Sequence, residues 1–153
     1  MDVKDYLKTH HVDYRATPHA KVFTAQEVAA VEHVSGDEVA KPVIVRFVDG
    51  RGLAMLVCPA SYRVDLAKAG EMLGGDVQLA TEADMRPIFG DAELGAEPPF
   101  GSFYDMPTYV DETLSQGEQI TFRAGRHTET ITMKWKRYIE LERPKVTKIA
   151  RHL

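Results

Sequence analysis

Two apolar runs around a glycine-rich turn constrain the fold of this chain more than any other feature. Residues 43–48 read VIVRFV, residues 53–58 read LAMLVC, and the segment DGRG lies at 49–52 between them. Short apolar runs bounded by turn residues are typical of β-strands, and two such runs joined by a tight turn form a hairpin. We therefore expect an antiparallel hairpin here.

The remaining pattern alternates between helical and extended segments. Thr24 and Glu27 have capping-box spacing, and Thr81 and Asp84 repeat that spacing before a short helix. The periodicity predicts helices at residues 2–10, 24–34, 61–75, 81–89 and 134–142, and further strands at 12–16, 76–80, 107–111, 119–123 and 128–133. Antiparallel strands with helices before, between and after them predict a single α+β domain spanning residues 1–153.

Composition excludes several classes of protein. The chain has 153 residues, of which 44% are hydrophobic and 27% charged, as in a globular domain. No apolar run approaches the roughly 20 residues that span a bilayer, and the N-terminal residues lack the apolar core of an export signal. Cys58 is alone, which excludes an internal disulfide and fits a reducing cytoplasm. We expect a cytoplasmic protein without a membrane partner.

The charge is unevenly distributed along the chain. The net charge is −4, which argues against a general DNA or RNA binder, yet the residues from Lys134 onward carry seven Lys or Arg against two Glu. Such a basic end can contact a phosphate backbone. It is equally typical of a solvated last helix followed by a charged tail.

Familiar catalytic signatures are missing from the sequence. There is no GxGxxG, P-loop, GxSxG or HExxH motif, and the six histidines never fall at helical metal-ligand spacing. We therefore expect no metal and no cofactor. Cys58 ends an apolar run before a proline, a pattern that favours a buried core residue over a nucleophile.

Three features remain as candidate site elements. Period-two alternation puts Lys41 on the same face as Val43 and Val45, where a lysine is either functional or extends its ammonium from the sheet end into water. The loop 95–101, GAEPPFG, has the glycines and prolines that can present fixed amide donors, or it is a rigid connector. His127 follows a turn and begins a strand, where a histidine is more often structural.

The order of these features carries a family resemblance. The segments HAKVFTAQEVA, EVAKPVIV, LVCPASYRVDL, GAEPPFG running into MPTYVDETL, and FRAGRHTETI follow one another along the chain. This order resembles the YbaK-like family, which includes the editing (insertion) domain of bacterial prolyl-tRNA synthetase and its free-standing relatives. The resemblance spans residues 5 to 139.

The resemblance implies both a fold and an activity. The fold would be a single α+β domain with a mixed, mostly antiparallel sheet and flanking helices. The activity would be trans-editing, the hydrolysis of the ester bond of a mischarged aminoacyl-tRNA that carries a small non-cognate amino acid, with tRNA-Pro the expected tRNA. The implied partners are the aminoacyl-tRNA acceptor end and prolyl-tRNA synthetase, and we expect a monomer.

The resemblance also implies roles for individual residues. Lys41 would hold the phosphate of the terminal adenosine, and the backbone of the loop from Gly95 to Pro99 would place the aminoacyl ester. His127 corresponds to a histidine of some branches of the family. The expected catalytic residues are Lys41, Gly95 and His127, and the expected substrate-binding residues are Pro99, Phe100, Gly101 and Asp111.

The chemistry of these residues agrees with ester hydrolysis. A lysine is a cation at neutral pH and suits a phosphate. No nucleophile–base pair is visible, so a positioned water, assisted by a ribose hydroxyl of the substrate, would attack the ester. Pro42 departs from the family, which usually has a small hydroxyl residue there. The alternative function is a non-catalytic module that binds a tRNA acceptor end or a synthetase. Phe23, Val31, Val45 and Phe100 are candidate pocket residues.

Overall fold

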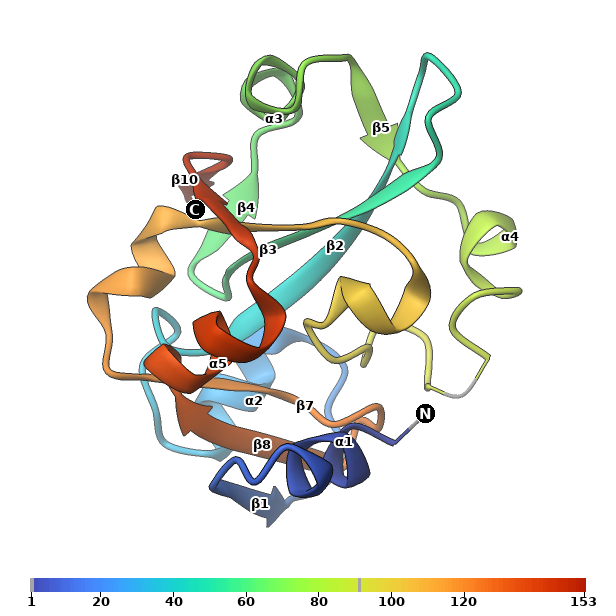
Figure 1. Ribbon diagram of the computed structural model, residues 1–153. Helices are drawn as coiled ribbons and strands as arrows, with labels where there is room; N and C mark the ends of the chain where they lie inside the picture. Colours follow the sequence, from blue (N-terminus) through green and yellow to red (C-terminus); the bar gives the residue numbers. More distant parts are fainter. Residues whose placement is uncertain (1, 91) are drawn as a thin grey trace.

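The computed structural model describes residues 2–90 and 92–153 (Figure 1). Its helices are α1 (Val3–Thr9), α2 (Ala25–Val31), α3 (Leu66–Leu73), α4 (Glu82–Met85) and α5 (Trp135–Glu142), with 3₁₀ turns at Gly101–Tyr104 and Glu112–Gln116. Its strands are β1 (Tyr14–Pro18), β2 (Ala40–Phe47), β3 (Leu53–Pro59), β4 (Tyr62–Val64), β5 (Val77–Leu79), β6 (Thr108–Asp111), β7 (Gln119–Arg123), β8 (Glu129–Lys134), β9 (Lys145–Thr147) and β10 (Ala150–His152).

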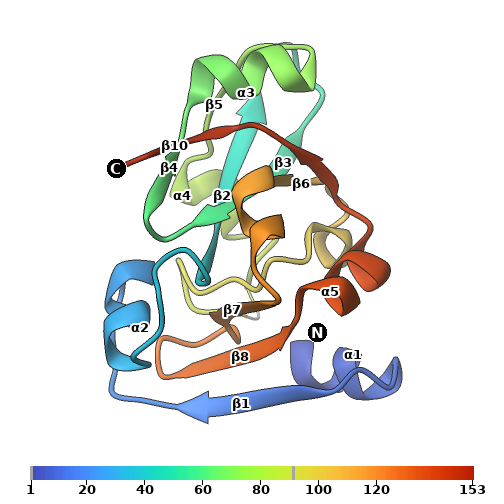
Figure 2. The same ribbon diagram turned by 90° about the vertical axis from the view of Figure 1, so that its left-hand side faces the viewer.

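The strands form three sheets around the predicted hairpin. The largest has the order β5-β2-β3-β6-β9, in which β3, β6 and β9 are parallel and the other pairs antiparallel. A three-stranded antiparallel sheet, β1-β8-β7, lies at the opposite end of the hairpin from α3 and β5 (Figures 1 and 2). The predicted α+β fold with a mixed, mostly antiparallel sheet is confirmed.

Three predicted segments differ from the structure. Residues 62–64 form β4 instead of the first turn of a helix, because they pair with β10 and the helix begins only after Asp65, whose carboxylate caps the amide of Lys68 at 3.1 Å. The basic end of the chain is not a solvated tail. It forms β9 beside β6 and then β10 beside β4 (Figure 2). In addition, α4 ends at Met85, short of the predicted residue 89.

Strand β2 is covered unevenly on the face that carries Lys41. Val39 packs under α2, whereas Val45 and Phe47 pack under α3 in a different core cluster. Val43 packs against the second cluster, and Lys41 lies between Val39 and Val43 on this face; both Lys41 and Val43 are only partly buried. Lys41 therefore lies on this face of β2 at the boundary between the two core clusters.

The outer edge of β2 is also interrupted. The carbonyl of Glu38 accepts the amide of Thr121 in β7 at 3.1 Å, and the carbonyl of Ile44 accepts the amide of Ala80 after β5 at 2.9 Å. Even-numbered residues of this segment thus direct their backbone groups to the outer edge, which no described strand covers between residues 40 and 43. Pro42 lies on that stretch, so its missing N–H removes no bond to β3.

Candidate active site

The uncovered edge of β2 forms one wall of a cavity of about 250 Å³. The loop after α4 provides the opposite wall. The cavity is lined by Pro42, Val43, Ile44, Leu79, Ala80, Met85, Leu94, Gly95 and Glu97. The structure therefore brings the predicted glycine loop against the strand residues that follow Lys41.

The glycine loop presents backbone amide donors at this cavity. Gly95 has φ +87°, a left-handed conformation that favours glycine, and its amide donates to Glu97 Oε1 at 3.0 Å. The amide of Ala96 donates to the Glu93 carbonyl at 2.9 Å. The amides of Leu94 and Glu97 have no acceptor among the described residues.

His127 lies directly behind the loop. Its side chain is buried, and Nε2–H donates to the carbonyl of Leu94 at 2.9 Å, because a carbonyl can only accept. In a neutral ring this bond leaves the lone pair on Nδ1, which is buried and has no hydrogen-bond partner in the described part of the chain. A Cβ on Gly95 would lie 3.7 Å from the imidazole Cε1, so the ring and the loop are in contact. Nδ1 is an unused acceptor beside the predicted loop.

An exposed aromatic ring adjoins the histidine. Phe23 is 61% exposed, and its ring centroid lies 5.1 Å from that of His127. The buried guanidinium of Arg123 fixes this segment by donating from Nη1 to the Phe23 carbonyl at 2.7 Å. Burial lowers the pKa of Arg123, while the negative charges of Glu97 and Glu27 raise it. Arg123 therefore links the Phe23 segment electrostatically to the glycine loop.

Lys41 supplies a cation without an internal partner. Its Cα is paired with that of Cys58 on β3, and no carboxylate of the described residues lies within ion-pair distance of its ammonium. Burial raises the pKa of the Cys58 thiol to about 12, an effect that the Lys41 charge opposes and Asp111 reinforces. The thiol is thus protonated at neutral pH, and the neighbouring ammonium can bind an external anion.

Asp111 lies at the end of β6, where its carboxylate bonds to the protein itself. Oδ1 accepts the amides of Ile149 and Ala150 at 2.9 Å each. Oδ2 accepts the amide of Thr113 at 3.1 Å and the hydroxyl of the same residue. These bonds attach the segment leading into β10 to the central sheet.

The second half of the predicted loop is buried in the core. Phe100 is fully buried against Phe122 and Tyr138. The Tyr138 hydroxyl donates to the Pro99 carbonyl at 2.6 Å. The amide of Gly101 donates to Thr108 Oγ1, and a Cβ at Gly101 would lie 2.8 Å from the carbonyl of Met106. Gly95 and His127 are therefore brought together beside Pro42, whereas Pro99, Phe100, Gly101 and Asp111 lie elsewhere.

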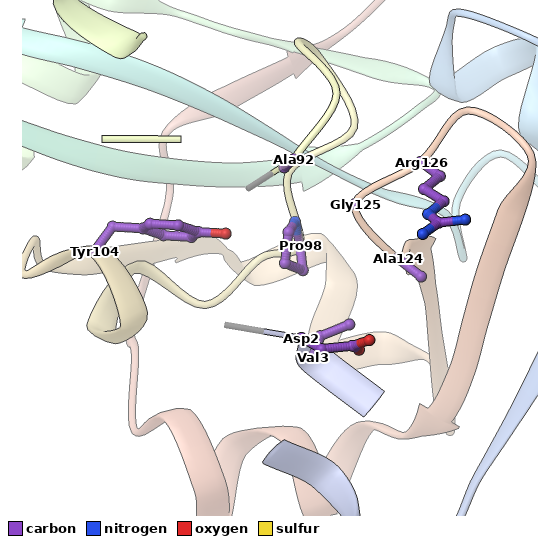
Figure 3. A pocket seen from close by; sticks show the side chains of 8 residues that line it. All are labelled: Asp2, Val3, Ala92, Pro98, Tyr104, Ala124, Gly125 and Arg126. Atoms are coloured by element: carbon purple, nitrogen blue, oxygen red, sulfur yellow. The ribbon is translucent and has the colours of Figure 1, made fainter. Parts of the chain in front are cut away.

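A second cavity, of about 240 Å³, lies on the other side of the glycine loop (Figure 3). Pro98 points into it between Tyr104 and Arg126, and Asp2 and Val3 at the start of α1 lie opposite. No sequence pattern predicts this cavity. Nor does a local pattern indicate the interaction of Glu97 with Arg123, because the two residues are far apart in the chain.

The described residues contain no group of three or more His, Cys, Asp or Glu side chains placed to hold a metal ion. They also contain no helix with the length and apolar character needed to cross a membrane. The site instead combines a cation, free backbone amides and one histidine acceptor. Such a set defines a site for a ligand with an anionic group and a polarised carbonyl oxygen.

The chain belongs to the aminoacyl-tRNA editing domain family, whose model matches residues 19–141. The curated relatives include the multifunctional Ser/Thr-tRNA deacylase ProXp-y of Escherichia coli strain K12. It is 23% identical over 150 residues, which cover 95% of this chain and 89% of the relative. This match confirms the prediction of an aminoacyl-tRNA editing enzyme of the deacylase class.

Solved structures share the fold. The hypothetical protein APE2540 superimposes with a TM-score of 0.87 at 22% identity, covering 97% of this chain and 99% of its own. A crystal structure described as a candidate trans-editing enzyme for prolyl tRNA synthetase gives a TM-score of 0.82 at 23% identity, with 97% and 94% of the two chains covered. At these identities the likeness establishes the architecture.

Proposed function

We propose that this protein hydrolyses the ester of a tRNA mischarged with a small amino acid, and that Lys41, the 94–97 loop and His127 perform the reaction. The observation that carries this proposal is that the glycine loop and the strand residues directly after Lys41 line one cavity. On these segments and beside them, four polar groups have no hydrogen-bond or ion-pair partner among the described residues: the Lys41 ammonium, the amides of Leu94 and Glu97, and Nδ1 of His127. An ester is already activated, so an editing site does not need a strong nucleophile. It needs polar groups that hold the substrate and position a water against the ester carbon.

Each group has a role in the proposed reaction. The Lys41 ammonium binds the phosphate of the terminal adenosine. The amides of Leu94 and Glu97 donate to the carbonyl oxygen as it gains negative charge. Nδ1 of His127 accepts a hydrogen bond from the attacking water or from the ribose hydroxyl that assists it. The water oxygen bonds to the carbonyl carbon, the bond to the ribose oxygen breaks, and that oxygen takes up a proton.

The size and lining of the cavity support a small amino acid. About 250 Å³ bounded mainly by apolar side chains accommodates a short side chain such as that of serine, threonine or alanine. A pocket of this kind discriminates by only about 1–3 kcal/mol per methylene, so several small residues would be accepted. We propose tRNA-Pro as the tRNA, because a fold relative is described as acting with prolyl tRNA synthetase.

The test is a panel of mischarged tRNAs incubated with the protein and scored for loss of the ester. We expect hydrolysis of at least one seryl, threonyl or alanyl ester. Lys41→Met should lower kcat/KM by roughly 100-fold or more, since the phosphate anchor is removed while the aliphatic stem is kept. Lys8→Met, on an exposed lysine of α1, is the matched control and should have no effect. Unchanged hydrolysis by Lys41→Met would contradict the proposed role of Lys41.

A further inference from the structure

The cavity beside β2 contains one carboxylate among apolar walls. Glu97 is 4% exposed and is the only charged residue among the side chains that line this cavity in the described chain. Its neighbours on the β2 side are Pro42, Val43 and Ile44. A buried carboxylate is unfavourable unless donors or an opposite charge compensate it, so the partners of Glu97 identify its role.

Only one of the two carboxylate oxygens of Glu97 accepts a hydrogen bond from the described residues. Oε1 accepts the Gly95 amide at 3.0 Å, whereas Oε2 accepts no hydrogen bond from any described residue. Arg123 is close enough for the two charges to interact but does not reach ion-pair distance, and its Nη1 donates instead to the Phe23 carbonyl. The second oxygen therefore has room for a donor supplied by a ligand.

We infer that Glu97 binds the α-ammonium group of the aminoacyl moiety; this inference rests on the proposed function. A free aminoacyl ester carries a primary amine that is largely protonated near neutral pH and has three N–H donors. The same loop would then hold the substrate at two points. The side chain of Glu97 binds the ammonium, and its unpaired backbone amide faces the ester carbonyl two bonds away in the substrate.

This arrangement has a chemical consequence for substrate choice. Esters whose amine is acylated have no ammonium for Glu97, and placing an uncharged amide there leaves the carboxylate without a cation. Peptidyl and N-formylated esters belong to this class. The enzyme should therefore hydrolyse free aminoacyl esters and spare N-blocked ones.

The experiment compares seryl-tRNA-Pro with N-acetylseryl-tRNA-Pro. Wild-type protein should prefer the free amine by about 100-fold in kcat/KM. Glu97→Gln should lose at least tenfold on the free amine and little on the acetylated ester, so the preference collapses. Glu71→Gln, on an exposed residue of α3, is the matched control. Urea denaturation of each variant reports whether the fold is intact.

The outcomes separate this inference from the proposed function. If wild-type protein hydrolyses both esters at similar rates, Glu97 does not select the ammonium, although the protein is still a deacylase. The same conclusion follows if Glu97→Gln lowers both rates equally. If wild-type protein hydrolyses neither ester nor any other mischarged tRNA, the proposed function itself is wrong.

Discussion

Two buried carboxylates of this chain have opposite surroundings. Asp111 is 1% exposed and accepts hydrogen bonds from four donors, two on Thr113 and the amides of Ile149 and Ala150. Glu97 is almost as buried and accepts one, from the described residues. Buried polar groups in folded proteins are usually satisfied, so an unsatisfied one needs its own explanation. Asp111 joins elements of the fold, whereas Glu97 retains capacity for a ligand.

The same contrast separates two buried ring side chains. Tyr138 is fully buried, and its hydroxyl donates to the Pro99 carbonyl at 2.6 Å. His127 is buried as well but leaves Nδ1 without a partner among the described residues. Lys41 extends the pattern, since its ammonium lacks a carboxylate partner there. Polar groups without a partner among the described residues thus occur on the glycine loop, on His127 behind it and on Lys41 near the start of β2, whereas satisfied groups join elements of the fold.

The largest effect is expected at the satisfied acid. Asp111→Ala leaves two buried amides and two partly buried donors of Thr113 without an acceptor; each buried one costs about 1–3 kcal/mol, so the free energy of unfolding should fall by about 3 kcal/mol or more. The measurement is equilibrium unfolding in urea. Asp37→Ala, which removes an exposed carboxylate that accepts from Ser61, should cost less than about 1 kcal/mol.

The Asp111→Ala variant also distinguishes a substrate-binding role of Asp111 from a structural one. Family resemblance assigned Asp111 to substrate binding, whereas its contacts favour a joint between β6 and the segment before β10. A variant with unchanged stability and lost deacylation would support the substrate role and contradict the structural one. A variant that is both destabilised and, once folded, active would support the structural role.

The sequence pattern correctly predicted the elements that depend mainly on residues close together in the chain. The hairpin of β2 and β3 follows from two apolar runs and a glycine-rich turn, and the capping boxes at Thr24 and Thr81 were visible as spacing. The pairing of β4 with β10 was not predictable, because it joins segments nearly ninety residues apart. Without that partner, residues 62–64 looked like the start of α3.

The candidate site shows the same division. Lys41 could be identified because a lysine on an apolar strand face is unusual, and the glycine loop because of its composition. The contact of Arg123 with Phe23 depends on how distant segments pack, whereas that of Glu97 with Gly95, two residues away, depends on the conformation of the loop. The roles of Phe100 and Gly101 were hidden for the opposite reason, since GAEPPFG looks like one loop although its second half lies in the core.

A smaller effect on stability, together with a loss of activity, is expected at the unsatisfied ring. His127→Phe keeps a ring of similar size, removes Nδ1, which has no partner among the described residues, and leaves the Leu94 carbonyl without its donor, so the free energy of unfolding should fall by about 1–3 kcal/mol, less than for Asp111→Ala. Deacylation should fall by roughly 10- to 100-fold if Nδ1 accepts from water or ribose. Steady-state kinetics and urea unfolding measure the two effects separately.

The chain contains a matched control for this substitution. His19 also donates one ring nitrogen to a carbonyl, from Nδ1 to Ala20 at 2.7 Å, and leaves Nε2 buried without a partner in the described residues. His19→Phe should leave kcat/KM within about twofold of wild type, because this ring does not contact the glycine loop. Equal losses from both variants would mean that an unpaired ring nitrogen does not by itself indicate function here.

The smallest effect is expected at Pro42, where the sequence departs from its family. Because the N–H position of Pro42 lies on the uncovered edge of β2, Pro42→Thr restores a donor that the sheet does not need, and stability should change by less than about 1 kcal/mol. The substituted residue would line the cavity between β2 and the glycine loop. If the family's hydroxyl contributes to substrate binding, KM should fall a few-fold while kcat stays unchanged. A loss of activity would instead show that the proline ring shapes this wall of the cavity, and that the substrate binds productively only when the proline is present.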